Sequence, residues 1–344
     1  MANVGLVAET TDDALGAGTG AAIVTPADEA DGPINGCAAP QSSGLSGSLS
    51  ILSSGSETNT VHVPQRPNMS TLFASATAVT KSSILTKTLK SLAWRNRYSQ
   101  EEKYPVTLSV PPSQPVTYYV DQIQAGEIDG TYGTGATVWP ASVVLIHYLE
   151  LQAAEKSDYF EDKSIIDLGA GTCVASIACA LLGARLIVAT DGNDHCVELA
   201  TSILDKASSE LKEVITPSKV VSDGERLIGR SEIRVRNYWW GKDDLAMLEE
   251  LDQPHYDFIL CSDVVLPKLY PIEPLVKAIA ALSGPNTVAY VSYEHRYYNE
   301  FDPRERFREL CEESGLEVKV IPHSEYHPSY CVDDIEIWTV CRTT

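Results

Sequence analysis

The amino-acid sequence predicts an α/β fold: a mostly parallel sheet with helices on both faces, closed by an antiparallel hairpin. Three observations predict it. Strand-like apolar runs and helix-like segments alternate from Ser164 onward, which is typical of parallel strands joined by crossover helices. A glycine-rich turn, DLGAGTCVA at 167–175, follows the first of these runs. The last two strand-like segments, LEVKVIP and DIEIWTVC, are joined by a loop too short for a helix crossover, so we expect them to be antiparallel.

The N-terminal part of the chain differs in composition from the rest. Residues 1–80 are rich in Gly, Ser, Ala and Thr and have no Lys or Arg before Arg66. Such a segment buries too little apolar surface to offset its ordering entropy, so we expect 1–80 to be disordered. Residues 81–104 carry leucines at helical spacing and predict a short helix that links to the domain or caps it.

The folded domain is expected to span 105–344. It begins with a predicted strand pair, VTLSV and VTYYVDQI, and a Thr/Gly-rich loop then leads into a helix that begins at Pro140. The expected strands of the alternating part are 164–168, 185–190, 232–236, 257–261 and 286–293. The expected helices are 173–183, 194–207, 243–251, 271–282 and 303–314.

Composition disfavours several classes of function. The chain has 344 residues, a formal net charge of −21 and a pI near 4.7, so we expect no affinity for nucleic acid or an anionic membrane. Eight cysteines are scattered singly without zinc-type spacing, and they predict buried reduced thiols and no metal site. The first residues have acids where a signal peptide has basic residues, and no apolar run reaches the roughly 18 residues of a membrane span. We therefore expect a monomeric protein of the cytoplasm or nucleus.

The glycine turn fits two kinds of ribose-bearing cofactor. A dinucleotide site has the pattern G-x-G-x-x-G/A; here Gly169 and Gly171 fit, but the third small position is Val174. S-adenosylmethionine brings no pyrophosphate and does not require that third small residue. Asp167 precedes the turn, where a carboxylate suits the ammonium of this cofactor. Asp191 ends the next strand, about 20 residues beyond the turn, where an acid accepts the ribose hydroxyls of either cofactor.

Residues at the later strand ends favour S-adenosylmethionine. Open α/β sheets bind ligands at the carboxyl ends of their strands. Trp240 follows the third strand of the alternating part and is suited to wall an adenine. Ser262 and Asp263 follow the next strand, and Glu294 the one after, which puts two carboxylates near a reacting methyl group.

Six blocks of the sequence resemble a known family: TGATVWPAS, IIDLGAGTCVASIACALLGA, ATDGND, YWWGK, CSDVVLPKLYPIEPLV and SYEHR. In this order they resemble the class I (seven-β-strand) non-SET protein-lysine methyltransferases of the methyltransferase-like 21 type, over roughly residues 105–344. The resemblance implies a seven-stranded Rossmann-like sheet, S-adenosylmethionine as cofactor and a protein lysine as methyl acceptor. Relatives methylate lysines in Hsp70 chaperones, the AAA ATPase valosin-containing protein and translation elongation factors, and we expect a protein partner of one of these kinds.

The same blocks imply site residues by position. The cofactor contacts implied are Trp139, Gly169, Ala170, Gly171, Asp191, Trp240 and Ser262. Asp263 falls on the acid of the family's Asp-x-x-Tyr segment, but the tyrosine of that segment is Leu266 here, so Tyr270 or Tyr293 would have to replace its aromatic wall. We expect Asp263 to orient the incoming amine and Glu294 to shape or charge the mouth of the acceptor channel.

Three alternatives stay open from the sequence. Leu266 leaves room for a methyltransferase that acts on another protein side chain or on a small molecule. A nicotinamide-dependent oxidoreductase is a second alternative, which Val174 and the terminal hairpin disfavour. The third is a scaffold that binds cofactor and partner and transfers nothing.

Overall fold

The computed structural model describes residues 94–95, 97–109, 115–123, 131–211, 226–298 and 301–343. All of them belong to one compact unit, Pro67–Thr344. The disorder predicted for 1–80 lies outside the described residues, as does most of the helix predicted within 81–104, of which Trp94 and Arg95 are helical. Packed structure begins upstream of the boundary predicted at residue 105, because strand β1 already starts at Lys103.

Among the residues described, the main sheet has eight strands in the order β5-β6-β4-β3-β7-β8-β10-β9. Its parallel strands are β3 (Ser164–Leu168), β4 (Leu186–Asp191), β6 (Ser231–Asn237), β7 (Tyr256–Ser262) and β8 (Ser283–Glu294). The others are β5 (Arg226–Ile228), β9 (Leu316–Val320) and β10 (Ile335–Arg342). Strand β10 is antiparallel to both β8 and β9 and lies between them, which confirms the predicted closing hairpin.

Two details of the sheet differ from the prediction. The short edge strand β5 adds an antiparallel eighth strand to the predicted seven, and its three residues are too few to give a period-two signal. Strand β8 begins at Ser283 rather than at 286, and its register against β7 is interrupted between the pairs Tyr256–Ser283 and Phe258–Val288, which leaves residues 284–287 opposite Asp257.

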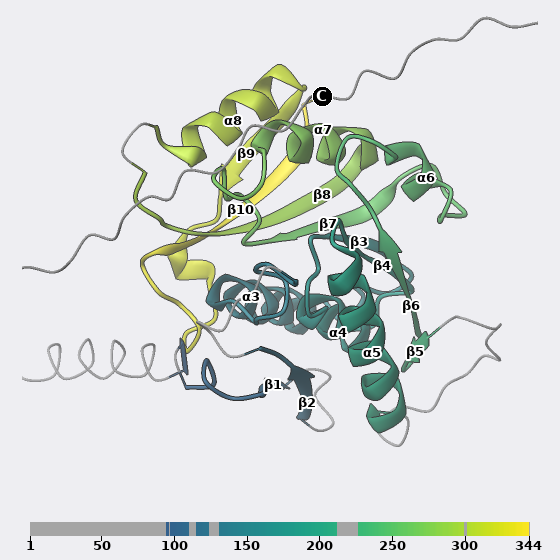
Figure 1. Cartoon of the computed structure of the whole chain (residues 1–344). Coiled ribbons are helices and arrows are strands. Elements are labelled where there is room, and N and C mark those ends of the chain that lie inside the picture. The colour runs from purple at the N-terminus through teal and green to yellow at the C-terminus, as the bar shows by residue number, and fades with distance from the viewer. Residues whose placement is uncertain are drawn as a thin grey trace, which may run out of the picture. The chain divides into compact units, whose positions relative to one another are not determined.

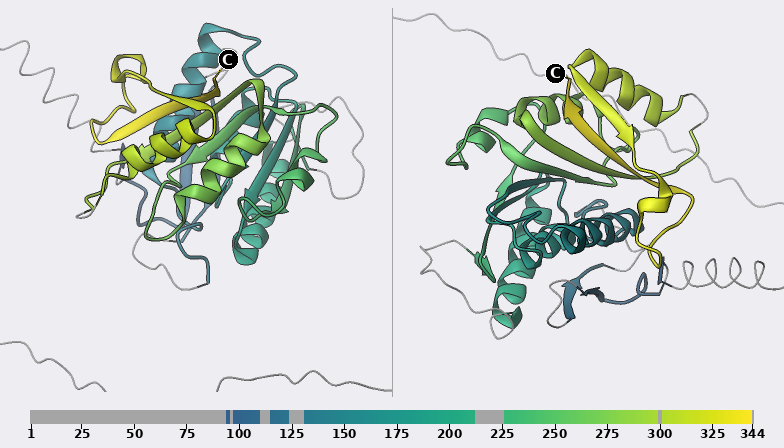
Figure 2. Two further views of the ribbon diagram at one scale, coloured as in Figure 1. Left: turned by 90° about the horizontal axis from the view of Figure 1, so that it is seen from above. Right: turned by 180° about the vertical axis from the view of Figure 1, so that it is seen from behind.

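Helices cover both faces of the sheet, as predicted (Figure 1). One layer consists of α3 (Pro140–Glu155), α4 (Val174–Leu181) and α5 (Asp194–Glu210). The other consists of α6 (Asp244–Leu248), α7 (Ile272–Leu282) and α8 (Pro303–Glu313), and the views of Figure 2 show the same two layers. A separate hairpin of β1 (Lys103–Leu108) and β2 (Val116–Asp121) packs against α3 and α5, and η2 (His323–Glu325) lies between β9 and β10.

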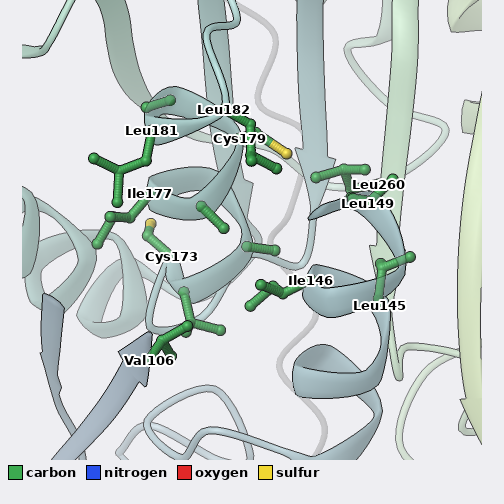
Figure 3. Close-up of a cluster of buried hydrophobic side chains, with 14 of the residues drawn as sticks. Val106, Leu145, Ile146, Leu149, Cys173, Ile177, Cys179, Leu181, Leu182 and Leu260 are labelled. Carbon is green, nitrogen blue, oxygen red and sulfur yellow. The ribbon is translucent and has the colours of Figure 1, made fainter. Parts of the chain in front are cut away.

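The core explains why the central strands read as unbroken apolar runs. Ile165 and Ile166 of β3 are both fully buried, one in the hydrophobic cluster beneath α3 and α4 and the other in the cluster beneath α7. Successive side chains of a strand point to opposite faces, so a sheet covered on both sides needs apolar residues at every position. Figure 3 shows the first cluster, in which Ile146 of α3 lies near Cys173 and the start of α4.

Two further expectations can be compared with the described residues. Buried cysteines are found at Cys173, Cys179, Cys196, Cys261 and Cys311. Cys331 and Cys341 are only partly buried, contrary to the expectation, and Cys37 lies outside the described residues. No helix in the described ranges is long and apolar enough to cross a membrane.

Candidate active site

The predicted site residues meet at one edge of the main sheet. Strands β3, β4, β6, β7 and β8 are parallel neighbours, so their carboxyl ends lie side by side (Figure 1). Gly169 follows β3, Asp191 ends β4, Trp240 follows β6, Ser262 ends β7 and Glu294 ends β8. The fold therefore brings together residues that are far apart in the sequence.

The glycine turn lies in close contact with two other loops. Gly169 and Gly171 have φ angles of +73° and +49°, in the left-handed region that favours glycine. A Cβ on Gly169 would lie 2.8 Å from Cγ1 of Val264, and a Cβ on Gly171 would lie 2.5 Å from the carbonyl oxygen of Gly135. The amide of Ala170 donates to the carbonyl of Thr190 at 2.8 Å. The absence of side chains at the two glycines thus lets the loops around Gly135 and Val264 form the walls of the site.

Asp191 is held at the end of β4 by backbone amides. Its Oδ2 accepts a hydrogen bond from the amide of Gly171 at 3.2 Å, and its Oδ1 accepts one from the amide of Asn193 at 3.0 Å. Burial raises the pKa of Asp191, whereas the two amide hydrogen bonds act in the opposite direction. Each carboxylate oxygen keeps lone pairs for a further donor, which fits the two hydroxyls of a ribose.

Three polar side chains with unpartnered atoms lie on one face of the sheet, close to its carboxyl edge. Asp167 is paired in register with Leu260, two residues before Ser262, and Ser262 is paired with Ser292. Paired residues and residues two apart in a strand share a face, so the three polar side chains point to the same side. Oδ1 of Asp167 and Oγ of both serines are buried and have no hydrogen-bond partner among the described residues. Buried polar atoms are normally paired, so these atoms fit a polar ligand such as the methionine end of S-adenosylmethionine.

Asp167 is the acid among these three residues, and its carboxyl group is deeply buried. It is 1% exposed, and the hydroxyl of Ser176 on α4 donates to its Oδ2 at 2.7 Å. Burial raises the pKa of Asp167 to about 7; the hydrogen bond from Ser176 opposes this rise, and the charge of Asp191 adds to it. A nearby ammonium group would stabilise the ionised form, which suits a residue that faces the amino group of the cofactor.

Asp167→Asn is expected to change how the stability of the ligand-free protein depends on pH. An unfolded Asp has a pKa near 3.9, so the folded state holds a proton that the unfolded state loses as pH rises from about 4 to about 7. Across that window the wild type loses stability on the order of 4 kcal/mol from this group, and the asparagine variant does not. Urea unfolding at several pH values should give a free-energy difference, variant minus wild type, that grows up to about pH 7 and then levels off. A difference that is constant with pH would contradict the burial effect.

Aromatic side chains surround the turn on the side expected to hold adenine. Trp240 lies edge-on to Tyr270, with ring centroids 5.9 Å apart. The hydroxyl of Tyr270 hydrogen-bonds Oγ1 of Thr134 at 2.5 Å, and Nε1 of Trp139 donates to the carbonyl of Thr134 at 2.9 Å. Trp139 and Trp240 are thus linked through two residues that the sequence did not point to as cofactor contacts.

Tyr270 and Tyr293, considered as replacements for the family tyrosine at the position of Leu266, pack against other aromatic residues. Tyr270 belongs to the adenine side with Trp240, and Tyr293 is buried against Trp338, with ring centroids 5.2 Å apart. The pKa of Tyr298 is raised chiefly by burial; the charge of Arg296 lowers it and that of Asp263 raises it, so Tyr298 lies within electrostatic reach of this ion pair. The position of Tyr298 depends on the course of the chain after β8. That segment has no helix-like or strand-like periodicity in the sequence, so the sequence did not predict where the ring lies.

Asp263 is held in a buried ion pair. Its side chain is 1% exposed, and Arg296 donates to both oxygens, from Nη1 to Oδ1 at 2.7 Å and from Nη2 to Oδ2 at 2.5 Å. The amide of Glu294 donates to the same Oδ1 at 3.3 Å. Burial raises the pKa of Asp263 although Arg296 opposes the rise. Its backbone φ of +60° is unusual outside glycine and marks a constrained position.

This geometry favours a role for Asp263 in fixing Arg296; its expected role in orienting the incoming amine stays a prediction. Both carboxylate oxygens accept a hydrogen bond from Arg296 and the side chain is 1% exposed, so the negative charge of Asp263 is already paired and shielded from solvent. Glu294 is also engaged: Oε1 accepts a hydrogen bond from Arg95, and Oε2 lies 3.8 Å from Nη2 of Arg296. Arg95 and Arg296 are the residues that sequence reasoning missed. Arg296 follows closely after Glu294 in SYEHR, whereas nothing in the sequence near Arg95 connects it to this site.

The described side chains fit S-adenosylmethionine. Asp191 suits the ribose, Trp240 and Tyr270 suit the adenine, and Asp167 lies where the amino group would be held. Within the described ranges, no group of three or more His, Cys, Asp or Glu side chains is arranged to hold a metal ion.

Comparisons with known proteins identify the family. Residues 120–310, more than half of the chain, match the family described as lysine methyltransferase. Over 198 residues the chain is 25% identical to the protein N-terminal and lysine N-methyltransferase EFM7 of Yarrowia lipolytica, covering 57% of this chain and 70% of that protein. Over 171 residues it is 30% identical to the protein N-lysine methyltransferase METTL21A of Xenopus tropicalis, covering 49% of this chain and 65%, just under two thirds, of that protein.

Further similarities are of the same kind. EEF1A lysine methyltransferase 3 of Xenopus tropicalis is 28% identical over 165 residues, covering 48% of this chain and 59% of that protein. A solved SAM-dependent methyltransferase from Agrobacterium tumefaciens is 13% identical with a TM-score of 0.42, covering 71% of each chain. The chain belongs to the lysine methyltransferase family, whose methyl donor is S-adenosylmethionine.

Proposed function

We propose that this lysine methyltransferase modifies a lysine on the surface of another protein, at the edge of the sheet where β7 and β8 end. The observation that carries the proposal is the buried ion pair of Asp263 and Arg296 at that edge, next to the glycine turn and its aromatic walls. An ordered guanidinium beside the methyl donor's site is suited to control the charge of the amine that enters there.

The chemistry requires a neutral amine. The new N–C bond forms as the S–C bond of the methyl donor breaks, so the nitrogen must present its lone pair. A lysine has a pKa near 10.4, and holding it neutral at pH 7 costs about 4 to 5 kcal/mol. A nearby cation and loss of water both disfavour the ammonium form. We infer that Arg296, fixed by Asp263, acts as such a cation beside the positive sulfur of the methyl donor. The lysine then gives up its proton to water before it enters the site, so that no separate base is required.

A rim of exposed apolar side chains supports a protein as the acceptor. We call Leu269, Tyr297 and Phe301 the acceptor rim; they are 58%, 89% and 44% exposed. Tyr298 follows Tyr297 in the chain; its ring lies 5.9 Å from that of Phe301, and Nζ of Lys268, the residue before Leu269, lies 5.5 Å over it. Exposed apolar clusters beside a site are typical of protein contacts, whereas a small acceptor would have no use for them.

The partner and its compartment are part of the same proposal. The relative named EEF1A lysine methyltransferase 3 supports an elongation factor as one partner to test, beside a chaperone and an AAA ATPase. A net charge of −21 favours a basic protein surface over nucleic acid or an anionic membrane. Buried thiols such as Cys179 and Cys261 agree with a reducing compartment, so we propose a monomer that works in the cytoplasm or nucleus.

Two measurements test the proposed function. Calorimetry should detect binding of S-adenosylhomocysteine and none of NAD. Incubation of the enzyme with methyl-labelled S-adenosylmethionine and fractionated cell extract should then label a protein band, in which mass spectrometry finds methylated lysine. Label in small molecules or on another side chain would overturn the lysine assignment. Cofactor binding without any label would favour the scaffold alternative.

Tyr297→Ala is expected to weaken binding of the protein acceptor selectively. The tyrosine ring is 89% exposed on the acceptor rim, so its removal leaves the fold intact and takes away only contact area. The KM for the labelled protein should rise about tenfold while kcat changes less than about twofold. Tyr119→Ala is the matched control, because Tyr119 is a 53% exposed tyrosine on the separate β1–β2 hairpin. Equal effects of the two substitutions would contradict the acceptor rim.

A further inference from the structure

Arg95, upstream of the predicted domain, reaches the acceptor edge of the sheet. Its Nη1 lies 2.8 Å from Oδ1 and 2.7 Å from Oδ2 of Asp334, and its Nη2 donates to Oε1 of Glu294. Glu294 ends β8 and is paired in register with Ile335 at the start of β10, so Arg95 bridges the ends of two neighbouring strands. The side chains of Arg95 and Glu294 are only 16% and 18% exposed.

The backbone around Arg95 is fixed by contacts other than this ion pair. The ring of Trp94 lies 5.4 Å from that of Tyr330, and Tyr98 lies edge-on to Tyr104 at 5.5 Å. Nε2 of Gln122 donates to the carbonyl of Tyr98 at 2.7 Å and to a second carbonyl of the same turn. The guanidinium of Arg95 is therefore held in place and does not depend on Glu294 for its position.

Glu294 and Asp263 compete for the same cation. Nη2 of Arg296 lies 2.5 Å from Oδ2 of Asp263 and 3.8 Å from Oε2 of Glu294. A free carboxylate at Glu294 would attract Arg296 away from Asp263. The hydrogen bond from Arg95 satisfies Glu294 from the opposite side.

We propose that Arg95 is a positioning residue for methyl transfer: it occupies Glu294, and Arg296 consequently stays on Asp263. Together with Asp334, these residues form a row of five side chains whose charges alternate in sign: Asp334, Arg95, Glu294, Arg296 and Asp263. The inference rests on the proposed function, in which the Asp263–Arg296 pair controls the entering amine. It assigns a role in the reaction to a segment that no signal in the sequence assigns to the site.

The kinetic test adds a second substitution to Arg95→Ala. If Arg95 were only structural, this second substitution would not restore kcat. Arg95→Ala should lower kcat for the labelled protein about tenfold, with the affinity for S-adenosylhomocysteine unchanged. Adding Glu294→Gln should restore kcat to within about threefold of wild type, because a neutral amide no longer attracts Arg296. Arg97→Ala is the matched control; it removes a cation from the same segment, where Arg97 lies over the ring of Tyr98 at 5.2 Å, and should leave kcat unchanged.

Two kinetic outcomes would overturn the inference. Wild-type kcat in Arg95→Ala would show that methyl transfer does not depend on Arg95, and the coupling between Asp263 and Arg296 then shows whether the ion pair was disturbed. A double variant as slow as Arg95→Ala would show that Arg95 only fastens the segment. If the alanine variant does not fold, Arg95→Gln, which keeps most of the side chain, takes its place in both comparisons.

A second measurement needs no methyl acceptor. The coupling energy between Asp263 and Arg296 is obtained from the unfolding of Asp263→Asn, Arg296→Gln and their double variant. This coupling should be smaller in an Arg95→Ala background and return in Arg95→Ala/Glu294→Gln. An unchanged coupling overturns the inference whatever the enzyme does. A coupling that changes as expected while kcat does not follow leaves the network in place and overturns the proposed role of the ion pair instead.

Discussion

Asp263→Asn is expected to abolish methyl transfer while S-adenosylmethionine still binds. Asparagine keeps the size of the side chain but loses its charge and one of the two acceptors that hold Arg296. Arg296 then turns to Glu294, 3.8 Å away, and the cation beside the entering amine is displaced. We expect kcat to fall about a hundredfold or more, because the lost interaction acts on the protonation and placement of the acceptor.

Single-turnover kinetics and calorimetry separate the two effects. The dissociation constant of S-adenosylhomocysteine should stay within about threefold of wild type, since the hydrogen bonds of the Asp263 side chain go to Arg296 and the Glu294 amide rather than to the glycine turn. Glu250→Gln is the matched control: Glu250 also binds arginines, Arg234 and Arg236, but next to β6, toward the other end of the strand order. Turnover that survives in Asp263→Asn, or that falls equally in Glu250→Gln, would contradict the role of the ion pair.

Gly171→Ala should disrupt the cofactor site itself. A Cβ at this position would lie 2.5 Å from the carbonyl oxygen of Gly135, a backbone atom that cannot turn aside, and φ is +49°. The two loops must separate, and Asp191 loses the amide of Gly171 that orients its carboxylate. We expect a loss in unfolding free energy of about 2 kcal/mol or more and a drop in S-adenosylhomocysteine affinity of at least about a hundredfold.

Gly133→Ala separates the clash from the backbone strain. Gly133 has a similar φ of +55°, but a Cβ there would meet nothing within 4 Å. Its substitution should cost only the left-handed strain, about 1 kcal/mol, with affinity nearly unchanged. Urea unfolding and calorimetry on both variants make the comparison, and equal losses in both would show that the contact with Gly135 has no influence on binding.

Most of the sheet could be predicted from the sequence, because a strand covered by helices on both faces of the sheet has apolar residues at successive positions. Strands β3, β4 and β7 are buried on both sides and read as apolar runs, and the acid at the end of β4 marks one position of the site directly. The carboxyl ends of parallel strands must share an edge, so the sequence predicts that Asp191, Trp240 and Ser262 lie together.

The parts that the sequence did not predict depend on contacts across long separations. Arg95 and Glu294 are 199 residues apart, and no periodicity connects them. Asp263 was expected to be free for an amine, but which cation a buried carboxylate pairs with depends on the course of the turn after β8. The pairing of Asp263 with Arg296 depends on the positions of the side chains in the folded protein, and no local sequence pattern indicates it.

The position of β10 inside the sheet has a consequence for the order of assembly. Strand β10 comes after β8 and β9 in the sequence, yet it lies between them in the sheet, so one side of β8 lacks this neighbour until residues 335–342 have been synthesised. Domains fold as their elements emerge, N-terminal parts first, and the half of the sheet that carries Asp191 can pair early. Asp334 directly precedes β10, so the partner of Arg95 arrives with that strand. The methyl-donor side of the enzyme can therefore form during synthesis, whereas the acceptor side closes only with the last strand.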